Sequence, residues 1–311
     1  MDDSVLLIIS MFAALASGIL RKIFTNQFEN NAFANQLFNF VTSISAAVVL
    51  LCWGGFSGFS WFTICLAVAF GVITALQQIS NLKAMNCGPW SYTSVITALS
   101  TLIPALSGVL IWQESLHWAQ IVGMVLMVAC FIFSIDSKED EKSASIKWLI
   151  WCSIAFLCTG FIGVMQKWHQ SSNYRGELNT FLIFAFIVSS VYSFVCCLGM
   201  KLKENKSSSI GTMLFGEETV QAKDGSFVKK MLVTAGIMIL VGVGCAVNNK
   251  LNLYLSGVMD SAVFFPIVNG GGLVLTTLAA VIVFKEKLSR KQWVGLIIGI
   301  ISVLFLANPF A

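Results

Sequence analysis

The sequence predicts an all-α membrane protein whose ten transmembrane helices form two inverted five-helix repeats. Three observations support this prediction: long apolar runs, charge confined to the connections between them, and a corner motif that occurs twice. Of the 311 residues, 57% are hydrophobic and only 11% are charged, whereas average globular domains carry about 25% charged residues. An apolar run of roughly 18 or more residues is typical of a spanning helix, while a spanning β-barrel shows two-residue alternation instead.

The apolar runs divide the chain almost completely. We expect helices at residues 4–23, 33–53, 58–82, 90–113, 118–135, 147–168, 178–200, 230–255, 261–284 and 291–308. The first run is expected to stay in the mature protein, because Met1-Asp2-Asp3 is acidic where a secretory signal has a basic segment. Most connections are short, so neighbouring helices should run antiparallel.

Two longer polar segments set the domain organisation. The charged stretch SKEDEKSAS lies in a linker at 137–146, which separates a first five-helix repeat at 1–136 from a second at 147–311. Within the second repeat, residues 201–229 are polar and rich in Gly and Ser. This composition predicts a loop that is mobile or only partly ordered.

The two halves share short motifs in the same order. The fourth run ends in Gln113-Glu114-Ser115-Leu116 and the ninth in Lys285-Glu286-Lys287-Leu288, and each motif is followed by a glycine inside the next run. We expect both glutamates to be structural corner residues. Because five is an odd number, two five-helix repeats lie in opposite orientations. Inverted repeats are common in secondary transporters, which bind substrate near the membrane midplane.

With these features the chain resembles the EamA-like branch of the drug/metabolite transporter superfamily. The resemblance covers the whole chain and rests on the five-plus-five arrangement and on the [QK]-E-[SK]-L…G signature of both corners. The first helix departs from the family, which often has Trp-Gly where this chain has Ser17-Gly18. The resemblance implies a carrier of small solutes, with a site between helices 1, 3, 4, 6, 8 and 9, and leaves the solute open.

The distribution of Lys and Arg predicts the orientation. All but three of the 19 basic residues fall on one side of the predicted topology, and the exceptions are Lys167, Arg175 and Lys250. The basic side should be cytoplasmic, which places both termini outside the cytoplasm. Members of the resembled family are usually drawn with both termini inside. The sequence therefore predicts a multi-pass protein of a prokaryotic plasma membrane with extracytoplasmic termini.

Polar residues inside the apolar runs are the best indicators of a site, because burying them costs free energy unless they are paired or face a wet cavity. The third and eighth helices each carry such a cluster, and the fourth and ninth carry further hydroxyl and amide groups beside Pro104 and Pro266. The candidate solute-binding residues are Thr74, Gln77, Gln78, Asn81, Tyr92, Thr97, Ser100, Asn248, Asn249, Lys250 and Asn269. The alternative is that the amides only bond neighbouring helices.

Lys250 is the one charged residue in this set. It lies before the predicted end of the eighth helix. In one interpretation its ammonium faces the cavity and binds an anionic group of the solute. In the other, its side chain extends to the lipid headgroups and anchors the helix.

The leading interpretation is a secondary transporter of a small polar metabolite that works by alternating access. The alternatives are a flippase for a lipid-linked sugar or lipid head group, and a scaffold without transport. We expect no enzyme, metal, cofactor or nucleic acid, since no catalytic or nucleotide-binding motif is present. No Asp or Glu lies inside a predicted span, which favours facilitated diffusion, exchange or ion coupling through neutral oxygens. Gly295 and Gly299 predict close helix packing, within one chain or in a homodimer.

Overall fold

A computed structural model of the chain describes residues 2–28, 31–87, 97, 99–115, 117–134, 146–203, 210–215, 226–283, 285 and 289–306. The regular structure in these ranges is helical, and they contain no strand. The prediction of an all-α protein is therefore confirmed for the part of the chain that is described.

Six described helices are long and apolar enough to cross a membrane. They are α1 (Asp3–Gln27), α2 (Ala32–Gly54), α3 (Trp61–Cys87), α7 (Ile146–Ser171), α8 (Leu178–Lys203) and α11 (Ser226–Val258). Further apolar helices are α5 (Leu102–Trp112), α6 (Trp118–Ser134), α12 (Ser261–Val283) and α13 (Arg290–Leu306). Large apolar side chains such as Leu110 and Ile282 are more than 70% exposed, as expected of helices that face lipid. These properties identify a membrane-embedded helical protein.

One expected loop contains more helix than the sequence suggested. Within 201–229, α8 continues to Lys203, a short helix α9 spans Ile210–Phe215, and α11 begins at Ser226. Residues from a distant part of the chain contact helix α9. The Asn31 amide donates to the Met213 carbonyl at 2.9 Å, and the ring centroids of Phe28 and Phe215 are 5.4 Å apart. Tertiary contacts thus hold the short helix α9 within a stretch whose composition favours a loop.

The chain packs into two compact units, and each unit draws on both halves of the sequence. Unit 1 comprises Met1–Met11, Leu76–Leu178 and Leu251–Ala311, and unit 2 comprises Phe12–Ala75 and Asn179–Lys250. The division falls within helices α1, α3 and α11.

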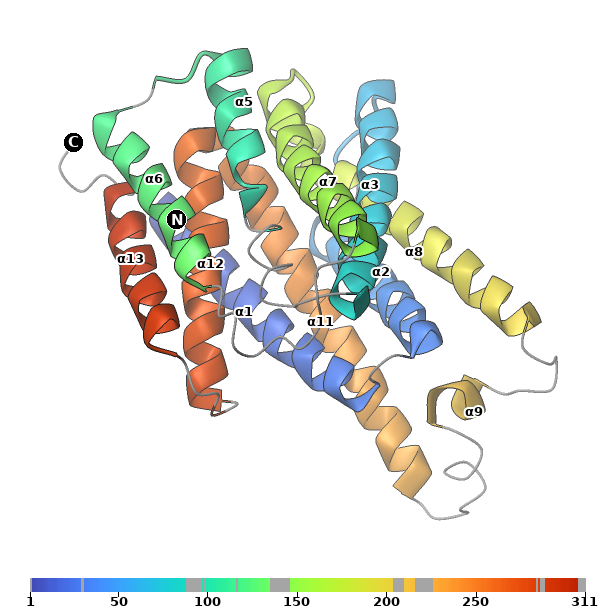
Figure 1. The fold of residues 1–311 in the computed structure, drawn as a ribbon. Helices are drawn as coiled ribbons and strands as arrows, with labels where there is room; N and C mark the ends of the chain where they lie inside the picture. Colours follow the sequence, from blue (N-terminus) through green and yellow to red (C-terminus); the bar gives the residue numbers. More distant parts are fainter. Residues whose placement is uncertain are drawn as a thin grey trace. The chain divides into compact units, whose positions relative to one another are not determined.

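In unit 1, helices α6, α12 and α13 lie side by side (Figure 1). Their shared core contains the buried side chains of Met127, Ile267 and Leu306. Glycines let the helices approach closely: a Cβ on Gly270 of α12 would collide with Met127 of α6. Helix α12 continues through Pro266 and the glycine run after it, so these residues do not interrupt it.

Unit 2 has a separate core that is rich in aromatic residues. Phe24, Phe28 and Phe38 pack with Met238 and Val241 of α11, and the ring centroids of Phe24 and Phe38 lie 4.5 Å apart. Aromatic pairs of this spacing stabilise a core beyond the area they bury.

Candidate functional site

Helix α3 carries four of the predicted site residues on one face. Thr74, Gln77, Gln78 and Asn81 recur at three- and four-residue spacing, which aligns side chains along a helix, and all four are half-buried. The side-chain oxygens of Thr74, Gln78 and Asn81 are buried and have no hydrogen-bond partner among the described residues. An unmet buried acceptor costs about 1 to 3 kcal/mol, so this face requires hydrogen-bond donors that the described chain does not supply.

The polar face of α3 turns toward protein and not toward lipid. One helical turn after Asn81, the fully buried Ala84 packs against Trp148 and Cys152 of α7. Another side of α3 carries Val72 and Leu76, which are 50% and 43% exposed. The amide side chains of the polar face therefore cannot simply extend into the lipid-facing surface.

Around the start of α5, the structure brings together some of the predicted residues of the fourth and ninth helices. Asn269 donates to the Thr101 hydroxyl at 3.3 Å and to the Phe265 carbonyl at 3.0 Å. Thr101 follows Ser100, whose hydroxyl donates to the Thr97 carbonyl at 2.6 Å. The amide and hydroxyl groups here are thus largely satisfied by the chain itself. Tyr92 lies outside the described residues.

Lys250 and its neighbours lie in unit 2. The Lys250 ammonium stands over the Trp53 ring, 4.2 Å from its centroid, next to the end of α2 at Gly54. Trp53 is 51% exposed, and a lysine over a half-exposed tryptophan is the geometry expected of a cation–π anchor. Asn249 donates to the Cys245 carbonyl of its own helix at 2.9 Å, and Asn248 is half-buried. A role of these residues in solute binding stays a prediction.

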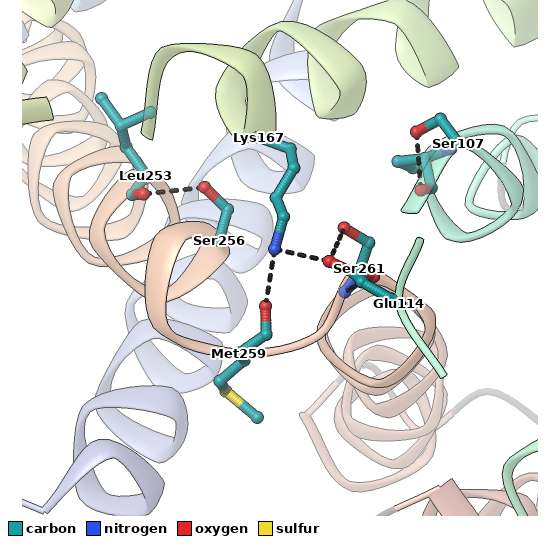
Figure 2. Close-up of polar contacts among 8 residues, drawn as sticks. Ser107, Glu114, Lys167, Leu253, Ser256, Met259 and Ser261 are labelled. Atoms are coloured by element: carbon teal, nitrogen blue, oxygen red, sulfur yellow. Dashed lines mark hydrogen bonds and ion pairs between the residues drawn. The ribbon is translucent and has the colours of Figure 1, made fainter. Parts of the chain in front are cut away.

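A buried ion pair in unit 1 joins three parts of the chain (Figure 2). The Lys167 ammonium of α7 lies 2.6 Å from Glu114 Oε1, and it donates to the Met259 carbonyl at 3.1 Å. The Glu114 carboxylate also accepts from Ser261, at 2.7 Å from the backbone N–H and at 3.2 Å from the hydroxyl. We call Glu114, Lys167, Met259 and Ser261 the carboxylate clamp.

The backbone around Glu114 is shaped for this contact. Helix α5 ends at Trp112, and Gln113 adopts a left-handed conformation with φ of 55°. The Glu114 N–H then donates back to the Gly108 carbonyl at 3.2 Å. A Cβ on Gly108 would collide with the Glu114 carboxylate and lie 2.6 Å from the Ser261 Cβ. Glycine at 108 therefore leaves the space into which the carboxylate folds.

The clamp is nearly closed to solvent, because the side chains of Lys167 and Glu114 are only 9% and 8% exposed. Removing two charges from water costs several kcal/mol per ion, and their attraction compensates only when the remaining donors and acceptors are also satisfied. The Ser261 N–H and the Met259 carbonyl meet that requirement. The clamp thus connects the corner after α5 with α7 and with the start of α12.

Sequence reasoning missed the clamp. It treated Glu114 as a corner residue and Lys167 as one of the few basic residues on the extracytoplasmic side. The available signal was the polar cluster Gln166, Lys167 and Gln170 at the end of an apolar run, and the structure buries all three. Burial predicts that such a lysine needs an anionic partner, but it does not identify the partner.

The predicted glycine face of α13 is occupied within unit 1. A Cβ on Gly299 would lie 2.8 Å from Cys130 Sγ of α6 and 2.9 Å from Val274 Cγ2 of α12, and Gly295 is buried. These glycines allow close packing inside the chain, and dimerisation stays a prediction. Within the described ranges, no group of three or more His, Cys, Asp or Glu residues is placed to hold a metal ion.

Comparison with known proteins supports the fold and leaves the function open. No protein-family model matches the chain. A protein of Haemophilus influenzae, described as uncharacterized, is 22% identical over 311 residues, with 96% of each chain covered. A solved chain described only as the crystal structure of a protein has a TM-score of 0.70 at 13% identity and covers 100% of both chains. At this identity the likeness shows the fold alone.

Proposed function

We propose that this chain is a secondary transporter that moves a small polar solute across the plasma membrane by alternating access. The observation that carries the proposal is the polar face of α3. Its oxygens at Thr74, Gln78 and Asn81 are buried without partners among the described residues, on a helix long and apolar enough to cross a membrane. A protein that only resides in the membrane gains nothing from this cost, whereas a carrier recovers it when a solute donates to these atoms.

A second observation supports the repeat architecture behind alternating access. Among the described residues, Gln113 and Lys285 are the non-glycine positions with positive φ, at 55° and 54°. They occupy the same position of the motif that the sequence repeats at its two corners. A matching backbone at matching positions supports a duplicated unit, and with it ten spans in two inverted halves and the resemblance to the drug/metabolite transporters. In this proposal both termini face outward.

Transport is tested with the full chain reconstituted in liposomes. The vesicles are incubated with an equimolar mixture of amino acids, sugars, sugar phosphates, nucleosides and quaternary amines, and their contents are measured by mass spectrometry against protein-free vesicles. We expect one chemical class to accumulate faster with protein present. A variant with Gln78→Met and Asn81→Leu should lose this difference, whereas Ser80→Ala on the same helix should keep it.

The same vesicles distinguish the alternatives. Identical contents with and without protein would refute transport of these solutes. Accelerated exchange of a head-group-labelled lipid between leaflets, without solute uptake, would identify a flippase. Neither activity would be the result expected of a scaffold.

A further inference from the structure

The atoms that lack partners on the polar face of α3 are all oxygens. They are Thr74 Oγ1, Gln78 Oε1 and Asn81 Oδ1. An amide oxygen only accepts hydrogen bonds, and a hydroxyl oxygen whose lone pairs are unmet also gains from a donor. A solute with several O–H or N–H groups would satisfy this face in the side-chain orientations that the structure holds.

The charge of the solute is a second criterion for the class of molecule that this face can bind. The oxygens of a carboxylate or phosphate are acceptors themselves, so they would oppose the amide oxygens of Gln78 and Asn81. A quaternary ammonium has no N–H to donate. A protonated amine has donors but needs a carboxylate nearby when it is desolvated, and the buried carboxylate of Glu114 is already held by Lys167. The other acidic side chains of the described ranges stand at helix ends.

A nearby positive charge also disfavours a cationic solute. Lys83 is two residues beyond Asn81 on α3, and its ammonium lies 4.2 Å from the centroid of the Trp151 ring. This contact holds the ammonium on the side of α7, close to the end of the polar face. A desolvated cation at Asn81 would be repelled by it.

We propose that the solute is a neutral, hydroxyl-rich molecule such as a sugar or polyol, which donates hydrogen bonds to Gln78 and Asn81. This inference rests on the proposed transport function and specifies its substrate class. The spacing agrees with it: at 1.5 Å per residue, the backbone positions of Gln78 and Asn81 are separated by about 4.5 Å along the helix axis. A solute with several hydroxyl groups can contact both side chains.

The test uses the full chain purified in detergent and a matched set of probes: glucose and sorbitol, the anion glucose 6-phosphate, and the quaternary amine choline. A ligand that binds only the folded state raises the apparent melting temperature. We expect stabilisation by glucose or sorbitol and none by the two charged probes. Asn81→Leu and Gln78→Met should each weaken binding by about ten-fold, the amount expected for one hydrogen bond. Ser80→Ala removes a buried α3 oxygen that also lacks a partner among the described residues but lies on another side of the helix, so it should leave binding unchanged.

Uptake separates this inference from the transport proposal. Proteoliposomes shrunk in hyperosmotic sorbitol should swell again faster than protein-free vesicles, and slower with Asn81→Leu. Binding and uptake of glucose 6-phosphate or choline in preference to glucose and sorbitol would overturn the substrate class and leave transport standing. If glucose and sorbitol change neither the melting temperature nor the rate of swelling, the proposed substrate class is also overturned. The liposome experiment with the mixture of metabolites then shows whether the transport proposal fails as well.

Discussion

Breaking the carboxylate clamp should destabilise the protein far more than its position at a helix corner suggests. Glu114→Gln leaves the Lys167 ammonium without a counter-charge, facing only neutral acceptors such as the Met259 carbonyl, in a site where that side chain is 9% exposed. Lys167→Met leaves the carboxylate on the Ser261 donors alone. Removing one partner of a buried pair costs about 3 to 5 kcal/mol, because an uncompensated charge remains buried.

The double variant makes this prediction specific. Glu114→Gln with Lys167→Met removes both charges and keeps an acceptor for the Ser261 N–H, so we expect it to cost less than either single change. The assay is equilibrium unfolding in mixed detergent and SDS micelles, followed by tryptophan fluorescence. Ser256→Ala is the control, because that hydroxyl lies outside the clamp and donates to the Leu253 carbonyl of its own helix, at 2.7 Å.

Exchanging the two charges should not rescue stability. In Glu114→Lys with Lys167→Glu, the ammonium would face the Ser261 N–H and the carboxylate would face the Met259 carbonyl, so both backbone contacts become repulsive. Single variants that each lose less than about 1 kcal/mol, the range of exposed ion pairs, would refute the reasoning. Full recovery in the exchanged variant would show that the backbone groups do not fix the polarity of the clamp.

Four further substitutions test close packing and the Lys250 anchor by the same unfolding assay. Gly108→Ala should cost about 1 to 3 kcal/mol, because its Cβ meets the Glu114 carboxylate and Ser261. Gly299→Ala should cost a similar amount against Cys130 and Val274, whereas Gly272→Ala, with no atom within 4 Å of its Cβ, should be neutral or stabilising; equal effects at both positions would contradict the packing argument. Lys250→Met should cost about 0.5 to 1 kcal/mol through loss of the contact with Trp53, and a larger loss would indicate a partner beyond that ring.

The sequence predicts the helices well because their apolar runs are local properties. The run at 178–200 corresponds to α8 at Leu178–Lys203, and the run at 261–284 to α12 at Ser261–Val283. Helix α9 was not predictable in the same way, since its order depends on Asn31 and Phe28 from a distant part of the chain. Local periodicity contains no information about such contacts.

For the candidate site too, local sequence spacing predicts some features, and others depend on tertiary contacts. A three- and four-residue spacing was enough to align Gln78 and Asn81 on one face of α3. It could not show that their oxygens lack partners, because that depends on what packs opposite. The clamp was harder still: Glu114 and Ser261 are 147 positions apart, and only the fold brings them together.

The carboxylate clamp and the polar face of α3 should respond to mutation in opposite directions. Lys167 and Glu114 are satisfied, so removing either partner destabilises the chain. The Asn81 oxygen is buried without a partner among the described residues, so Asn81→Leu, which is nearly isosteric, should stabilise the solute-free protein by about 1 kcal/mol. The same change should weaken solute binding, the trade-off expected where a binding site is kept at a cost in stability. Unfolding of both variants in the same micelles decides the matter: if Asn81→Leu destabilises as Glu114→Gln does, the α3 oxygens serve packing, and the case for a solute site on that face fails.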